Sequence, residues 1–199
     1  MRVIACDEAG LDEAAAILNA GGVAVIPTDT VYGLAAHPGF PAAVERLYTI
    51  KGREAKKPIA LLAADVAAVG AFGYPLTGEA HALAERHWPG ALTLVVERTD
   101  GAATEGFRVP DHDWTRRLLR RCGGVLRVTS ANLSGQRPAT DAPAALADVG
   151  LSADVVVDDG VSPGGVPSTV VRVFSDGSLK VLRAGSIDVP SLSNRNDTR

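Results

Sequence analysis

The chain has 199 residues, of which 46% are apolar and 22% are charged, and its formal net charge at pH 7 is −3. This length and balance are typical of one globular domain, and the slight acidity argues against a protein that coats nucleic acid through its overall charge. Only 5% of the residues are aromatic, so aliphatic side chains must fill most of the core.

Helical and strand patterns alternate through the first half of the chain. Residues 11–20 predict a helix that ends at Gly21-Gly22, and residues 23–26 predict a strand. Pro41 suits the first position of a helix that runs to about residue 50. The patterns that follow predict a buried strand at 59–64, a helix at 77–87 and a buried strand at 91–97.

The second half continues this alternation and ends in a hairpin. Its patterns predict helices at 113–121 and 141–148 and strands at 125–131, 154–159, 168–174 and 179–185. Asp176-Gly177 predicts the tight turn that joins the last two strands as an antiparallel pair. We therefore expect an α/β fold with a mixed sheet and flanking helices, formed by residues 1–186 and followed by a polar C-terminal tail at 187–199.

The sequence carries little signal for export, membrane insertion, disulfides or metals. No apolar run approaches the roughly 20 residues that span a bilayer. Acidic residues near the N-terminus lie where a signal peptide would be apolar. Two cysteines are too few for a disulfide framework, and the four histidines lack zinc-site spacing. We expect a cytoplasmic protein with no resident metal and no membrane contact.

Polar residues follow several of the predicted strands directly. In open α/β sheets ligands bind outside strand ends, where loops present backbone N–H groups and short side chains. Each of these residues has an alternative role as a helix cap or a turn residue, and the repetition at several strands favours a shared crevice. The candidates for that crevice are Thr28, Thr30, Ser130, Asn132 and Ser134.

Two segments are rich in basic residues. KGREAKKP (51–58) offers flexible cations beside Gly52, which suits phosphate oxygens, and a solvated basic turn explains it equally well. RRLLRR (116–121) has helical spacing, which favours a solvated helix face. The sequence has no Walker loop and no GxSxG elbow. Any chemistry would therefore depend on positioning and charge stabilisation.

Seven short segments stand out in order along the chain: PTDTVYGL (27–34), KGREAKKP (51–58), WPGALT (88–93), RVPDH (108–112), TSANLSG (129–135), ST (168–169) and RAG (183–185). Together they resemble the YrdC/TsaC family of threonylcarbamoyl-AMP synthases. Ala91 and Ala184 stand where proline is expected, and Arg127 is an unusual charge inside a strand. The chain resembles the short form of the family, which lacks an additional C-terminal domain.

The resemblance implies a YrdC-like fold with a concave basic cleft and an ATP-dependent reaction. L-threonine, bicarbonate and ATP would give threonylcarbamoyl-AMP and pyrophosphate, with Mg²⁺ held mainly by the phosphates. Other tRNA threonylcarbamoylation proteins would then receive the adenylate as partners, and a weak direct contact with RNA is compatible with the cleft.

The resemblance also implies a role for individual residues. Arg53 and Lys57 would act in catalysis on the phosphates. The residues implied for threonine are Thr30, Leu62, Arg108, Ser130 and Ser168, and those implied for ATP are Lys51, Arg53, Lys57, Thr104, Asn132, Thr140 and Arg183. For Arg108 the alternative is a surface ion pair with Asp111 or Asp113.

Three other hypotheses compete with the synthase function. An RNA-binding module would use the basic cleft for nucleic acid, but few aromatic residues are present to stack bases. A carbamoyl-transfer domain like that of hydrogenase maturation proteins would sit in a longer chain with zinc-finger-like and acylphosphatase segments. A regulatory YrdC-like module without catalysis has no sequence feature that separates it from the synthase.

Overall fold

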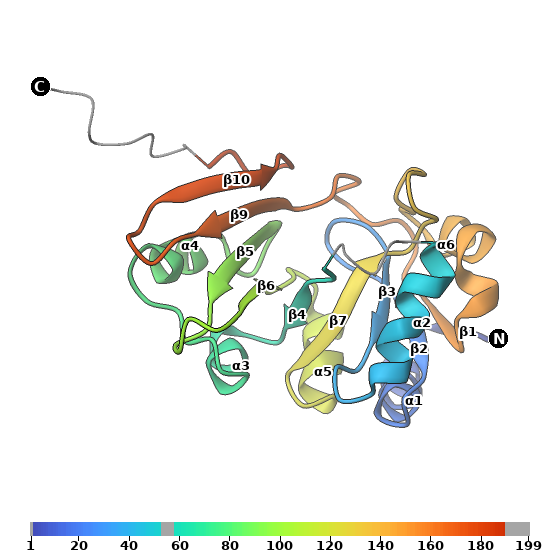
Figure 1. Cartoon of the computed structure of the whole chain (residues 1–199). Coiled ribbons are helices and arrows are strands. Elements are labelled where there is room, and N and C mark those ends of the chain that lie inside the picture. The colour runs from blue at the N-terminus through green and yellow to red at the C-terminus, as the bar shows by residue number, and fades with distance from the viewer. Residues whose placement is uncertain (1, 53–57, 190–199) are drawn as a thin grey trace, which may run out of the picture.

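The computed structural model describes residues 2–52 and 58–189, which form a ten-stranded mixed sheet with helices on both faces (Figure 1). The strands are β1 (Arg2–Ala5), β2 (Val23–Ile26), β3 (Gly33–Ala36), β4 (Leu61–Ala63), β5 (Leu92–Glu97), β6 (Thr104–Arg108), β7 (Val125–Ser130), β8 (Val155–Asp158), β9 (Thr169–Val173) and β10 (Leu179–Arg183). Their order in the sheet is β1-β8-β2-β3-β7-β4-β6-β5-β9-β10. This arrangement confirms the predicted fold class.

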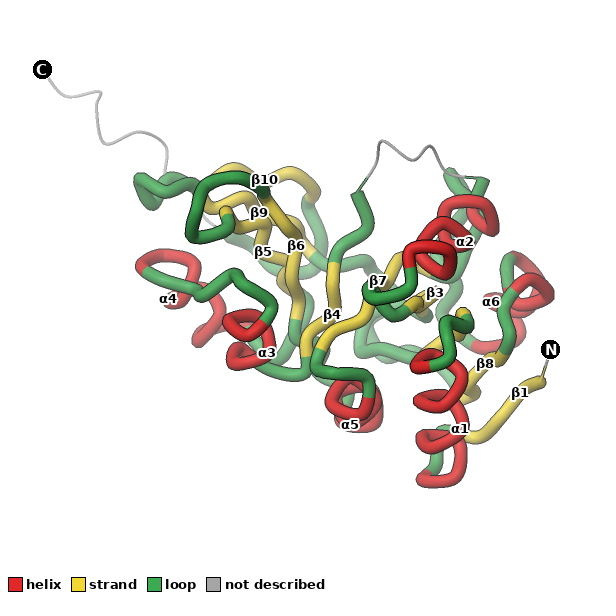
Figure 2. The backbone as a smooth tube through the Cα atoms, turned by 60° about the horizontal axis from the view of Figure 1, so that its bottom comes forward, coloured by secondary structure: helices red, strands yellow, loops and turns green. Residues whose placement is uncertain are grey.

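Helices cover both faces of one half of the sheet and a single face of the other half (Figure 2). The helices are α1 (Glu8–Asn19), α2 (Pro41–Lys51), α3 (Val66–Ala71), α4 (Gly78–His87), α5 (Asp113–Arg121) and α6 (Ala142–Asp148), with a short 3-10 turn at Gly150–Ser152. Around β2, β3 and β8, α1 and α5 pack on one face and α2 and α6 on the other. These three strands are therefore apolar on both sides.

Side-chain alternation along β5 shows why the other half of the sheet is different. Leu92, Leu94 and Val96 point into the core beneath α3 and α4. Thr93 and Val95 point to the opposite face, where they line a cavity. Because successive strand residues face opposite sides, one face of this half is packed and the other is available to a ligand.

Most predicted elements are present within one to three residues of their expected ends. The helix expected to begin at residue 11 begins at Glu8, because the Asp7 carboxylate caps it by accepting the Gly10 N–H at 2.8 Å. The helix at 113–121 has the predicted bounds. The predicted hairpin is confirmed, since β9 and β10 pair antiparallel around the turn at Asp176-Gly177.

Besides the short 3-10 turn, four elements were not predicted from the sequence: β1, β3, β6 and α3. The sequence of β3, GLAA, has no β-branched residue, and it forms a strand because β2 and β7 pair with it on both sides. The β6 sequence, TEGFR, has no apolar run and is likewise fixed by its neighbours β4 and β5. Tertiary pairing outweighs local preference in both.

The arginines of α5 form ion pairs along an exposed helix face. Arg117 and Arg121 both contact Glu8 on α1, and Arg121 also contacts Asp12. The other two arginines pair with Asp113 and Asp65. These contacts agree with the predicted solvated face and join α5 to the helix beside it.

No helix among the described residues has the length and apolar character required to cross a membrane.

Candidate functional site

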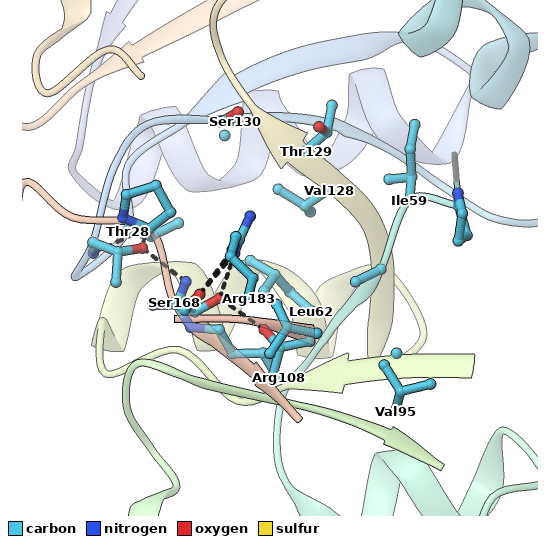
Figure 3. A pocket seen from close by; sticks show the side chains of 18 of the residues that line it. Thr28, Ile59, Leu62, Val95, Arg108, Val128, Thr129, Ser130, Ser168 and Arg183 are labelled. Carbon is cyan, nitrogen blue, oxygen red and sulfur yellow. Dashed lines mark hydrogen bonds between the residues drawn. The ribbon is translucent and has the colours of Figure 1, made fainter. Parts of the chain in front are cut away.

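A cavity of about 380 Å³ opens on the uncovered face of the sheet (Figure 3). Its apolar walls come from Ile59, Leu62, Val95, Val128 and Val170. Its polar groups come from three places: the loop between β2 and β3, the strands β5, β6 and β7, and the segment that leads into β9 together with the end of β10. Segments far apart in the sequence thus place hydroxyl and guanidinium groups around one apolar floor.

The loop between β2 and β3 is held by hydroxyl groups. Thr28 Oγ1 donates to the Val31 carbonyl at 2.7 Å and accepts the N–H of Thr30 at 3.2 Å, which closes the turn. Thr30 Oγ1 lies 3.0 Å from Thr28 Oγ1 and accepts from Arg108 at 2.7 Å. Because the Thr28 hydroxyl gives its own proton to the Val31 carbonyl, the Thr30 hydroxyl is the donor in their contact. Thr30 is therefore fixed at the cavity wall.

The same loop is backed by the segment before β9. The N–H groups of Gly164 and Gly165 donate to the carbonyls of Asp29 and Thr30 at 3.1 and 2.8 Å. A Cβ atom on Gly164 would lie 2.6 Å from the Asp29 carbonyl oxygen, so this approach requires glycine.

Arg108 is the buried charge at the centre of the wall. Its Nε donates to the Gly90 carbonyl at 2.9 Å, one terminal nitrogen donates to Thr30, and the other pairs with Asp29. The side chain is 7% exposed. Burial lowers the pKa of the guanidinium and the nearby Asp29 opposes that shift, so the group stays charged. The alternative of a surface pair with Asp111 or Asp113 is wrong, because β6 directs this side chain inward.

Arg183 and Ser168 form a second polar corner (Figure 3). Nε and one terminal nitrogen of Arg183 donate to the Ser168 carbonyl at 3.0 and 2.8 Å, and that terminal nitrogen also lies 3.1 Å from Ser168 Oγ. Ser168 Oγ lies 2.8 Å from Thr93 Oγ1. The charge of Arg183 contributes to lowering the pKa of Arg108, so the two guanidinium groups lie close enough to repel. An anion between them would relieve that repulsion.

Lys51 anchors the loop after β7 from behind. Its side chain is buried at the end of α2, and Nζ donates to the carbonyls of Ser130 and Asn132, the second at 2.6 Å. The Asn132 amide donates in turn to carbonyls within its own loop, those of Leu133 and Gln136, at 2.9 and 2.8 Å. These two side chains position Ser130 at the cavity.

The cavity brings together seven of the residues implied by the resemblance, but not all of them. Lys51, Asn132 and Thr140 do not line it, and neither does Ser134. Arg53 and Lys57 lie outside the described residues. The seven that line it are Thr30, Leu62, Thr104, Arg108, Ser130, Ser168 and Arg183.

Sequence reasoning missed three polar contributors to this site. Asp29 lies between the two threonines that were singled out, so its position in TDT was a usable signal for the Arg108 pair. Thr93 sits inside an apolar strand and gives no such signal. Glu105 lines the cavity and pairs with Arg127 at 2.5 Å, which explains the unexpected charge inside β7.

Comparison with known proteins identifies relatives of this chain. The family model described as Sua5_yciO_yrdC, Telomere recombination, matches residues 16–185. A threonylcarbamoyl-AMP synthase of Bacillus subtilis (strain 168) is 35% identical over 184 residues, which cover 88% of this chain and 53% of that protein. The threonylcarbamoyl-AMP synthase of Homo sapiens is 34% identical, over 88% of this chain and 67% of that protein.

Solved structures show the same fold. The crystal structure of P. abyssi Sua5 complexed with L-threonine superimposes with a TM-score of 0.85 at 30% identity, covering 92% of this chain and 57% of that one. E. coli YciO superimposes with a TM-score of 0.82 at 24% identity, covering 96% of this chain and 98% of that one. The chain thus spans about half the length of the Bacillus relative and of P. abyssi Sua5.

Proposed function

Because the chain belongs to the Sua5/YciO/YrdC family, we propose that it forms L-threonylcarbamoyladenylate and pyrophosphate from L-threonine, bicarbonate and ATP. Relatives that are 34% and 35% identical to this chain are named threonylcarbamoyl-AMP synthases, and P. abyssi Sua5 was crystallised with L-threonine. The observation that carries the proposal is a buried arginine, Arg108, with the Thr30 hydroxyl beside it at the edge of an apolar cavity.

Threonine fits the corner of the cavity between β4, β6 and the 27–32 loop. Its carboxylate is the natural partner of the Arg108 guanidinium, which offers several N–H groups in one plane. Thr30, Ser130 and Ser168 supply hydroxyls that can hydrogen-bond its polar groups, and Leu62 supplies apolar surface for its methyl group. The 380 Å³ cavity is at the lower end of the usual range for small-molecule sites.

ATP fits the side of the cavity that Arg183 and Thr104 define. Arg183 would neutralise phosphate oxygens, and its hold on Ser168 connects the nucleotide side to the threonine side. Arg53 and Lys57 would complete the phosphate site and act in catalysis. Mg²⁺ would bind mainly to the phosphates, since that ion usually keeps several waters and uses few protein ligands. The cleft would then be basic, as the resemblance implies.

The reaction needs cations between two anions. The neutral threonine amino group forms a carbamate by adding to carbon dioxide with loss of a proton, or by condensing with bicarbonate with loss of water. A carbamate oxygen must then attack the α-phosphorus of ATP as pyrophosphate leaves. Fixed guanidinium groups lower the repulsion between these anions and require no reorganisation during the reaction. Arg108 would hold the amino acid, and Arg183 with Arg53 and Lys57 would hold the phosphates.

The remaining steps depend on other molecules. Threonylcarbamoyl-AMP is a mixed anhydride, so partner proteins would transfer its threonylcarbamoyl group to an adenosine of tRNA, in the cytoplasm. A weak direct contact between this chain and RNA would be compatible with that path.

Pyrophosphate release tests the proposal directly. Protein is mixed with ATP and Mg²⁺, and L-threonine and bicarbonate are added singly and then together. We expect release only when both are present. Release that needs neither substrate, or activation by RNA in place of threonine, would contradict the proposal.

A further inference from the structure

A second cluster of reactive side chains lies outside the cavity, near the sheet edge formed by β1. Cys6, His112 and Asp159 each offer one ligand atom, and these atoms all lie within 4.8 Å of one another. We propose that Cys6 Sγ, His112 Nε2 and an Asp159 carboxylate oxygen form a binding site for a divalent transition metal, Zn²⁺ above all.

The backbone brings two of these ligands together. Strands β1 and β8 pair in parallel with Ala5 opposite Asp158, and the Cys6 N–H donates to the Asp158 carbonyl at 3.1 Å. Cys6 and Asp159 therefore leave the carboxyl ends of adjacent strands side by side. Ligands held by sheet pairing lose little freedom when a metal binds, which favours affinity.

The third ligand is fixed by the start of α5. His112 is the N-cap residue of this helix, and its Nε2 points at Asp159 Oδ2, 2.8 Å away. On the other side of the ring, Nδ1 caps α5 by accepting the Thr115 backbone N–H at 3.3 Å, and it also lies 3.0 Å from Thr115 Oγ1, whose own proton goes to the Pro27 carbonyl at 2.7 Å. While Nδ1 caps the helix in a neutral ring, the ring proton lies on Nε2 and Asp159 accepts it. A metal at Nε2 would move this proton to Nδ1, where the Thr115 hydroxyl can accept it in place of the cap, an outer contact that metal-bound histidines usually make.

The distances suit one metal ion. Zn²⁺ binds sulfur, nitrogen and oxygen at about 2.0 to 2.3 Å, so ligand atoms around a tetrahedral ion lie roughly 3.3 to 3.7 Å apart. His112 Nε2 and Asp159 Oδ2 are 2.8 Å apart, slightly closer than that range, and the other separations are at most 4.8 Å; the Asp159 side chain is 42% exposed, so it can rotate into position. Three protein ligands would leave the fourth position to water, the arrangement that zinc sites with an open position share.

The same cluster is a poor covalent catalyst without a metal. Burial, followed by the hydrogen bond to Asp159 and its charge, raises the pKa of the Cys6 thiol to about 12, so the thiolate nucleophile is absent at neutral pH. Both ring nitrogens of His112 already have other hydrogen-bond partners. A bound cation would stabilise the thiolate instead.

A metal here would also stiffen the wall of the cavity. The Tyr32 hydroxyl donates to the Gly160 carbonyl at 2.8 Å and accepts the Asp159 N–H at 2.9 Å, and Tyr32 lines the cavity. The segment that begins at Asp159 continues to the glycines that hold the 29–30 backbone. An ion bound by Asp159 would thus fix the start of the segment that supports the Arg108 corner.

Zinc binding by the full chain tests the site. The protein is freed of metal with a chelator and then titrated with Zn²⁺ against a coloured zinc chelator. Co²⁺ serves as a second probe, because a cobalt–thiolate bond gives a charge-transfer absorption band. We expect one Zn²⁺ per chain and a cobalt–thiolate band. Mutating a residue that only hydrogen-bonds to a metal ligand typically lowers metal affinity about 10- to 100-fold. Cys6→Ser removes a ligand itself, so its Zn²⁺ affinity should fall by at least that factor and its cobalt–thiolate band should disappear.

Two further variants make the test specific. Cys122→Ala removes the other cysteine, which is buried in the core beside α5, and should keep both stoichiometry and band. His112→Asn retains a side chain that can cap α5 while removing the imidazole, and it should weaken Zn²⁺ binding as Cys6→Ser does. Thermal unfolding without metal shows whether each variant folds. A parent chain that binds no Zn²⁺, or binding that persists in both ligand variants, would overturn the proposal.

Discussion

Replacing Arg108 with lysine separates the shape of this side chain from its charge. Lysine keeps one positive charge but has no planar set of N–H groups, so it cannot serve the Gly90 carbonyl, the Thr30 hydroxyl and the Asp29 carboxylate together. We expect Arg108→Lys to weaken threonine binding and to lower the free energy of unfolding.

The structure sets the size of both effects. An ammonium that stays with Asp29 leaves two former acceptors without their buried donor, which costs about 2 to 4 kcal/mol of stability. For a surface pair with Asp111 or Asp113, the loss would be about 0 to 1 kcal/mol. The lost two-bond fork to a carboxylate should also reduce threonine affinity by roughly tenfold or more.

Calorimetry with threonine and chemical denaturation measure the two quantities. Arg98→Lys is the matched control, because Arg98 also forms an arginine–carboxylate pair, with Asp100, but on an exposed turn where its side chain is 44% accessible. The control should change neither quantity by much. If Arg108→Lys binds threonine as tightly as the parent and unfolds at the same denaturant concentration, the role given to Arg108 is wrong.

Three further changes probe other parts of the site. Lys51→Met removes the ammonium that two buried carbonyls share, so denaturation should show a loss of about 2 to 4 kcal/mol, and unchanged stability would contradict this anchor. Arg53→Ala and Lys57→Ala should each weaken ATP binding about 10- to 150-fold while threonine affinity changes little. Unchanged ATP affinity in calorimetry would instead support the alternative that 51–58 is a solvated basic turn. Tyr32→Phe removes a hydroxyl with two backbone partners and should lower stability by about 1 to 3 kcal/mol in urea denaturation, whereas an unchanged midpoint would show that water replaces it.

The sequence predicted those parts of the fold that local patterns specify. The helix at 113–121 and the hairpin at Asp176-Gly177 follow from spacing and turn chemistry, which act over a few residues. Strand β3 did not follow, because GLAA becomes a strand only between two partners that lie elsewhere in the chain. Although β3 was not predicted, the predicted site was unaffected, because Thr28 and Thr30 in the loop before this strand were already candidates.

Residues of the site that belong to short motifs were predicted, whereas residues that only the fold brings together were not. Thr30, Arg108, Ser168 and Arg183 meet at one cavity although up to 153 positions separate them, and only the resemblance to a family grouped them in advance. The cluster of Cys6, His112 and Asp159 has no motif at all, because its members lie in three loops: the pairing of β1 with β8 brings two of them together, and the start of α5 supplies the third.

The buried cations link substrate affinity to the stability of the fold in this cavity, because both depend on the same contacts. Arg108 and Lys51 each reach through the protein to a loop that presents a hydroxyl, Thr30 in one case and the Ser130 loop in the other. A buried charge requires several partners to offset its lost hydration, so the partners become fixed as well. The hydroxyls are therefore positioned before a substrate arrives, which lowers the ordering cost of binding. Substitutions at either cation should consequently change substrate affinity and unfolding together, whereas substitutions of the cavity hydroxyls that leave the cations paired should change affinity more than stability.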